Sequence, residues 1–132
     1  IAYSGDVEVS EFKDIERVMD VDFWGVVNGT KAFLPYLIES GDGHVVNVSS
    51  LFGIIGPPGQ AAYVASKFAV RGFSDSLRQE LAPHGVGVTT VHPGGIATNI
   101  ATSARVGGGV GSDEQASHRD VAAKLPLPVY LS

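Results

Sequence analysis

The strongest constraint on the fold of this chain is a helical segment that lies between two short runs of β-branched residues. The runs are HVVNV at 44–48 and GVGVTTV at 85–91, and turn-forming residues bound both of them. The helix predicted from about Ala61 to Leu81 ends where Pro83 and Gly85 forbid its continuation. A strand, a long helix and a second strand predict a βαβ unit with parallel strands.

The segments around this unit also have readable patterns. HVVNV accumulates apolar residues rather than alternating them, so we expect a strand that is buried on both faces, as in a parallel sheet. A helix is predicted just after Ser10, where Phe12, Ile15 and Val18 recur at the helical period. A second helix, from about Asp20 to Ile38, is apolar on more than one side, which predicts burial against a sheet and against something else.

Tyr63 and Lys67 lie four residues apart in the predicted central helix. This spacing puts the two side chains on one face, with Cβ atoms roughly 5–6 Å apart. A phenol has a pKa near ~10, and a neighbouring ammonium lowers it toward the range useful for a general acid or base. The pair alone is equally typical of a half-buried aromatic beside a lysine that extends to solvent. Ser50 offers a hydroxyl at the strand end, and alternation sends Ser49 to the opposite face.

Together these residues resemble the active-site pattern of the short-chain dehydrogenase/reductase family. The serine lies thirteen positions before the tyrosine, the tyrosine four before the lysine, and NVSS and PGGIAT complete the match over about residues 1–112. The resemblance implies an α/β, Rossmann-like doubly wound parallel sheet, of which the βαβ unit and a preceding long helix form the C-terminal part. It also implies an oxidoreductase that transfers a hydride between NAD or NADP and a carbonyl or secondary alcohol.

The resemblance assigns roles residue by residue. Tyr63 would pass the proton and Ser50 would hydrogen-bond the substrate oxygen. Lys67 would lower the pKa of Tyr63 and, with Tyr63, would contact the cofactor by binding the nicotinamide ribose hydroxyls. Asp22 stands 28 positions before the serine, where the family commonly has an asparagine. A carboxylate accepts hydrogen bonds but cannot donate an amide hydrogen, so Asp22 is either an altered proton-relay residue or purely structural.

The segment PGGIATNI follows the second predicted strand at its carboxyl end, the edge where open α/β sheets bind ligands. The resemblance places Pro93, Gly94, Ile96 and Thr98 at the cofactor, with Ile96 and Thr98 orienting the nicotinamide ring. Thr98 is also a good N-cap residue for the segment that follows it. The Gly-rich turn that receives the pyrophosphate in such folds is missing from the sequence. The acidic or basic residue that would choose between NAD and NADP is missing as well, so the sequence does not predict which of the two is bound.

Composition excludes several classes of function. The formal charge of −5 gives no electrostatic footprint for nucleic acid and disfavours an anionic membrane surface. The sequence has no cysteine, which rules out disulfides, and its four scattered histidines predict no metal site. No apolar run approaches the ~20 residues that span a bilayer, and the N-terminus does not resemble a signal peptide. We therefore expect a cytoplasmic protein that acts on a small molecule.

The 132 residues are expected to form one partial dehydrogenase domain, because the chain starts at Ile1 and lacks the Gly-rich half. Within it, 101–121 is predicted to be a mobile substrate loop and 122–132 an irregular tail. Spare apolar residues on the two long helices predict a homo-oligomer. The alternative function is therefore a non-catalytic fragment or pseudoenzyme that acts through this oligomerisation surface.

Overall fold

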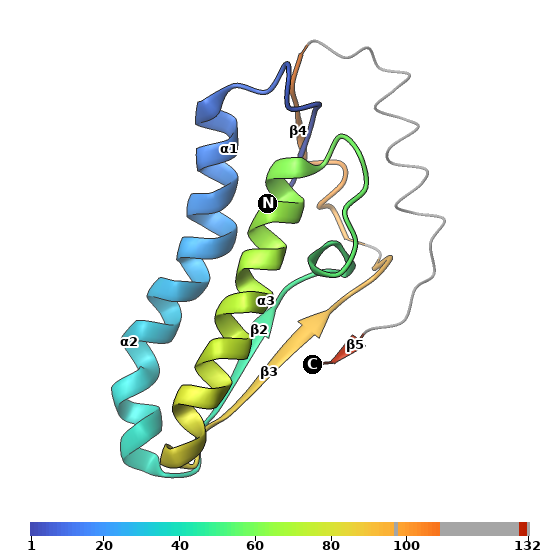
Figure 1. The fold of residues 1–132 in the computed structure, drawn as a ribbon. Helices are drawn as coiled ribbons and strands as arrows, with labels where there is room; N and C mark the ends of the chain where they lie inside the picture. The colour runs from blue at the N-terminus through green and yellow to red at the C-terminus, as the bar shows by residue number, and fades with distance from the viewer. Residues whose placement is uncertain (97, 109–129, 132) are drawn as a thin grey trace.

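The computed structural model describes residues 1–96, 98–108 and 130–131, and Figure 1 shows their arrangement. Helices α1, α2 and α3 lie on one side of strands β2 and β3. The elements in chain order are β1 (Tyr3–Ser4), α1 (Phe12–Met19), the π-helical segment η1 (Asp20–Trp24), α2 (Gly25–Ser40), β2 (His44–Val48), the 3₁₀ turn η2 (Leu51–Gly53), α3 (Ala61–Leu81), the 3₁₀ turn η3 (Ala82–His84), β3 (Gly87–His92), β4 (Arg105–Val106) and β5 (Tyr130–Leu131).

The predicted βαβ unit is confirmed. Strands β2 and β3 pair in parallel from His44 opposite Gly87 to Val48 opposite Val91, and α3 connects them with the predicted bounds. The second strand starts two residues later than expected because Gly85 takes a left-handed conformation, with φ of 71°, that ends the preceding helical turn. The chain is therefore an α/β fold with parallel central strands.

The two predicted upstream helices form one uninterrupted helix. Segment η1 joins α1 to α2 without a break, and α2 continues through Pro35 until Gly41 ends it with φ of 66°. The expected helix from Asp20 to Ile38 is thus present, but its first five residues are π-helical. Short π segments in α-helices are found frequently at functional sites.

The expectation that HVVNV is buried on both faces is wrong. Val45 and Asn47 are buried, whereas Val46 is 57% exposed and Val48 is 54% exposed. Helix α3 covers the first face, and none of the described elements covers the second. The main core lies on the covered face, between α2, α3 and the strands; its buried members are Val45, Leu77, Leu81, Val86 and Val88.

The short strands modify the prediction for the C-terminal region. Arg105–Val106 pair in parallel with Tyr3–Ser4, so the predicted mobile loop contains a strand in its described part. Tyr130–Leu131 pair antiparallel with the end of β3, so the predicted irregular tail also contains a strand. The rest of both predictions falls at 109–129 and 132, outside the described residues.

Candidate active site

The structure brings Ser50, Tyr63 and Lys67 together where β2 ends. Ser50 follows the strand and caps η2, its Oγ accepting a hydrogen bond from the Phe52 backbone N–H at 3.2 Å. The same hydroxyl lies close enough to the side chain of Tyr63, from the first turn of α3, to lower the pKa of that phenol. Lys67, one turn later, places its Nζ 5.4 Å from the centre of the Tyr63 ring. The predicted helical spacing therefore gives a compact group of hydroxyl, phenol and ammonium.

The Tyr63 ring is fixed by its neighbours. It is 8% exposed, and the Phe52 ring meets it edge-on with centroids 6.0 Å apart. Burial raises the pKa of Tyr63, the Ser50 hydroxyl lowers it, and the Asp22 carboxylate raises it, with burial the largest effect. The prediction of a lowered phenol pKa is therefore wrong, because loss of solvation disfavours the phenolate more than the Ser50 hydroxyl favours it.

Lys67 is partly buried, and its Nζ lies 3.5 Å from the backbone carbonyl oxygen of Val48, the last residue of β2. Burial lowers the pKa of Lys67, and the negative charge of Asp22 raises it. The ammonium thus lies between the strand end and the phenol ring. In that position it can stabilise a phenolate when the proton leaves Tyr63.

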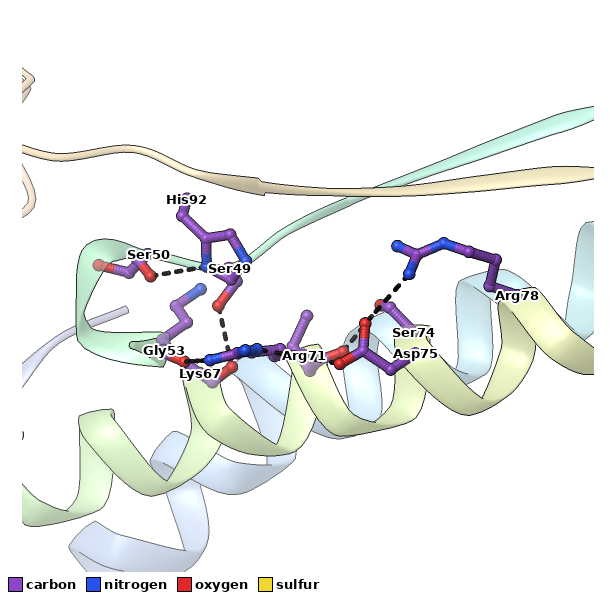
Figure 2. Close-up of polar contacts among 10 residues, drawn as sticks. Ser49, Ser50, Gly53, Lys67, Arg71, Ser74, Asp75, Arg78 and His92 are labelled. Carbon is purple, nitrogen blue, oxygen red and sulfur yellow. Dashed lines mark hydrogen bonds and ion pairs between the residues drawn. The ribbon is translucent and has the colours of Figure 1, made fainter. Parts of the chain in front are cut away.

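A second set of contacts holds the turn that carries Ser50. Ser49 is buried and points away from Ser50, as alternation predicts; its Oγ donates to the backbone carbonyl of Lys67 at 2.9 Å. Gly53 packs against the same carbonyl, and Arg71 Nη1 donates to the Gly53 oxygen at 3.4 Å. Figure 2 shows these side chains gathered between η2 and α3. The turn is therefore tied to the helix that carries Tyr63.

Asp22 lies in the π-helical segment and is 6% exposed. Its Oδ1 is 2.6 Å from the backbone nitrogen of Ile1, and its Oδ2 is 3.5 Å from Ser66 Oγ. Ser66 is fully buried on α3 and donates to the Tyr63 backbone oxygen at 2.7 Å. The carboxylate is close enough to raise the pKa of both Tyr63 and Lys67, so it belongs to the electrostatics of this site.

The PGGIAT segment begins beside Ser50, because the backbone N–H of Leu51 donates to the Pro93 carbonyl at 2.9 Å. Gly94 accepts a backbone hydrogen bond from Ile96, whose side chain is 53% exposed. Thr98 is exposed, and its Oγ1 accepts from the Ile100 N–H at 3.4 Å, the contact expected of a capping threonine. The structure therefore places this segment at the same edge as Tyr63.

Two residues at this edge were not among the predicted site residues. His92 is 1% exposed, and its Nδ1 lies 3.0 Å from the Ser50 carbonyl oxygen. Arg71 contacts the η2 turn and Asp75. Its position one helical turn after Lys67 was the signal in the sequence.

Comparison with known proteins identifies the family. A profile described as short chain dehydrogenase matches residues 2–107. The chain belongs to the short-chain dehydrogenase/reductase family. The predicted resemblance is confirmed, and it covers the whole of β2, α3 and β3. In the described part of the chain, no helix is long and apolar enough to cross a membrane, and no three histidine, aspartate or glutamate side chains form a candidate metal cluster.

Relatives and solved structures agree with this membership. A Mycobacterium tuberculosis (strain H37Rv) protein named as an oxidoreductase, SadH, is 68% identical over 111 residues, which are 83% of this chain and 40% of the relative. Mitochondrial D-beta-hydroxybutyrate dehydrogenase of Rattus norvegicus is 40% identical over 108 residues, 80% of this chain and 31% of that protein. The chain thus spans less than half the length of these curated relatives.

Among solved structures, a short-chain dehydrogenase from Streptomyces avermitilis matches with a TM-score of 0.79 and 29% identity. The match covers 95% of this chain and 47% of that one. LigO from Sphingobium sp. strain SYK-6 matches with a TM-score of 0.68 and 27% identity over 97% of this chain and 50% of the other. The architecture is therefore part of the Rossmann-like fold of the family.

Proposed function

We propose that this chain carries the catalytic part of an oxidoreductase that transfers a hydride between NAD or NADP and a carbonyl compound or secondary alcohol. The observation that supports the proposal most directly is the grouping of the Ser50 hydroxyl, the Tyr63 phenol and the Lys67 ammonium where β2 ends. These groups lie at the carboxyl end of parallel strands, where α/β folds bind ligands. Family membership and the dehydrogenase names of relatives are consistent with this chemistry.

Tyr63 acts as the general acid in the direction of carbonyl reduction. Because its pKa is raised, the side chain is a neutral phenol at neutral pH and holds the proton that the substrate oxygen needs. Ser50 accepts from the Phe52 N–H, which leaves its hydroxyl proton available for the Tyr63 oxygen or the substrate oxygen. The Lys67 ammonium stabilises the phenolate that remains.

The residues present fit the nicotinamide end of the cofactor. Lys67 and Tyr63 would hold the ribose hydroxyls, and the segment from Pro93 and Gly94 to Ile96 and Thr98 would hold the ring, since Pro93 is bound to the residue after Ser50. The cofactor supplies the hydride, and the protein supplies orientation and the proton. This sequence does not contain the Gly-rich turn that would hold the adenosine end of the cofactor.

The proposal is tested by adding NADH or NADPH to the full chain and following cofactor fluorescence and thermal unfolding. Turnover is then measured with a panel of ketones and secondary alcohols. Binding of one cofactor together with reduction of at least one ketone is the expected result. Absence of binding and of turnover with both cofactors would reject the enzymatic proposal for this chain.

Replacing Asp22 with asparagine is expected to shift the pH profile of alcohol oxidation to lower pH. The carboxylate raises the pKa of Tyr63, so its removal lowers that pKa, and the phenolate that serves as the base forms at lower pH. The measurement is kcat against pH for both proteins. Asp20→Asn, an exposed carboxylate in the same π-helical segment, is the matched control and should leave the profile unchanged. An unshifted profile for Asp22→Asn would show that the carboxylate acts only structurally.

A second candidate function is association through the two long helices, the one that runs through η1 and α2 and the one formed by α3, with or without catalysis. Large side chains on both are solvent-exposed in the single chain: Trp24 at 51%, Phe33 at 66% and Tyr36 at 70% on the first, and Phe68 at 41% on α3. Exposed apolar groups that gather on a surface mark interaction sites. They support the proposal of a homo-oligomer that buries them between two copies.

Light scattering on a sizing column at micromolar concentration is expected to give the mass of a dimer or larger oligomer. Phe33→Glu should convert the protein to monomer, because a charge cannot be buried without a partner. Phe33→Leu, which keeps an apolar side chain at the same position, should stay associated. A monomeric mass for the unmodified chain would contradict the proposed surface.

A further inference from the structure

His92 is the last residue of β3, and its side chain lies behind the strand end that carries Ser50. It is 1% exposed, and its Nδ1 lies 3.0 Å from the Ser50 carbonyl oxygen (Figure 2). A carbonyl oxygen can only accept a hydrogen bond, so Nδ1 must carry the proton and donate it. The imidazole therefore holds the main chain of the residue whose hydroxyl contacts Tyr63.

Backbone hydrogen bonds to Val91 and Pro93 fix the two residues on either side of Ser50. The Ser49 N–H donates to the Val91 carbonyl at 2.8 Å, and the Leu51 N–H donates to the Pro93 carbonyl at 2.9 Å. Both bonds extend the β2–β3 pairing past the last strand residues. They fix the neighbours of Ser50 and leave its own carbonyl to other donors.

Two donors meet that carbonyl: the Gly53 backbone N–H at 2.8 Å and the His92 imidazole. Ser50 is the point where the chain leaves an extended conformation, with φ of −164° and ψ of 166°, and enters η2. A rotation of the peptide unit after Ser50 would turn the start of η2 and move the Phe52 N–H that holds Ser50 Oγ. The second donor opposes this rotation.

We propose that His92 is a positioning residue that fixes the Ser50 peptide and thereby the hydroxyl that meets Tyr63. The proposal rests on the proposed function for its catalytic consequence, but the positioning itself is a property of the folded chain. Since Pro93 follows directly, the same strand end also sets where the proposed cofactor segment leaves the sheet. His92 acts through Ser50 and does not touch the substrate.

The catalytic test compares His92→Leu with His92→Asn. Asparagine places its Nδ2 at the branch position of the imidazole Nδ1 and can donate to Ser50, whereas leucine has the same branching and no donor. Small misplacements of catalytic groups cost up to about 10²-fold, so His92→Leu is expected to lower kcat at least about tenfold relative to His92→Asn, with the cofactor KM unchanged. Equal kcat for the two variants would overturn the proposal, as would a change in the cofactor KM with no change in kcat.

Two readouts need no turnover, so they separate this inference from the proposed function. Nitrogen-15 NMR of the unmodified chain, with the imidazole neutral, should show the tautomer with the proton on Nδ1; a proton on Nε2 would overturn the proposal even if His92→Leu failed to fold. Hydrogen exchange of the Gly53 amide should be faster in His92→Leu than in His92→Asn, with the Gly87 amide at the other end of the ladder as control. Equal Gly53 exchange in the two variants would also reject positioning. Absence of turnover in the unmodified chain would reject only the enzymatic proposal.

Discussion

Tyr63→Phe is expected to lower kcat for carbonyl reduction by about 10²- to 10⁴-fold, the range that general acid catalysis contributes. The substitution removes only the phenol oxygen, so the ring keeps its edge-on contact with Phe52. The proton donor is lost while the Lys67 ammonium and the Ser50 hydroxyl remain. Cofactor binding should change less than kcat, because Lys67 would still hold the ribose hydroxyls whereas the proton donor is lost. The measurement is kcat and KM with the most reactive ketone of the panel.

Tyr36→Phe is the matched control for this experiment. Tyr36 is 70% exposed on α2, so removal of its hydroxyl should leave kcat unchanged. Circular dichroism of both variants establishes that the fold is retained. If Tyr63→Phe retained wild-type kcat, the proton would have to come from another group, and the proposed role of the Ser50, Tyr63 and Lys67 group would be wrong.

Gly53→Ala is expected to destabilise the protein by about 1–3 kcal/mol, the usual cost of inserting a methyl group into a packed site. The added Cβ would overlap the Ser49 hydroxyl and stand 3.0 Å from the Lys67 carbonyl oxygen. It would therefore break the hydrogen bond from Ser49 to α3, which is 2.9 Å long. The η2 turn would move away from the helix, and Ser50 with it, so kcat should fall along with the free energy of unfolding.

Gly72→Ala provides the control for Gly53→Ala, measured by urea denaturation. Gly72 lies within α3, and a Cβ built there meets nothing within 4 Å. This substitution should stabilise the protein by about 0.5–1 kcal/mol, because alanine loses less backbone entropy than glycine in a helix. Adding Ser49→Ala to Gly53→Ala removes one of the two overlapping groups and should restore part of the lost stability. A Gly53→Ala protein as stable as wild type would contradict the packing argument.

The features that the sequence predicted correctly depend on near neighbours in the chain. The bounds of α3 follow from helix-forming residues and from Pro83 and Gly85, and Tyr63 and Lys67 meet because a helix brings residues four apart onto one face. Strand alternation likewise separated Ser49 from Ser50 correctly. Each of these relations is a local geometric consequence of the backbone, so no tertiary information was needed.

The features that the sequence did not predict depend on which helices and strands pack against each other. The raised pKa of Tyr63 follows from burial, which outweighs the lowering effect of the Ser50 hydroxyl and acts in the same direction as the Asp22 charge. The exposed face of β2 follows from which elements cover the sheet, since Val46 and Val45 are the same residue type with opposite burial.

The sequence alone therefore determined the βαβ unit and the family pattern of Ser50, Tyr63 and Lys67. Only the tertiary structure decided that Gly53 must lack a side chain and that His92 holds the Ser50 carbonyl. His92 and Ser50 are 42 positions apart and meet only because β2 and β3 end at the same edge. The identity and spacing of the site residues can be read from the sequence, because they are local. The burial and packing that set the Tyr63 pKa and the contacts of Gly53 and His92 come from residues that are distant in the chain.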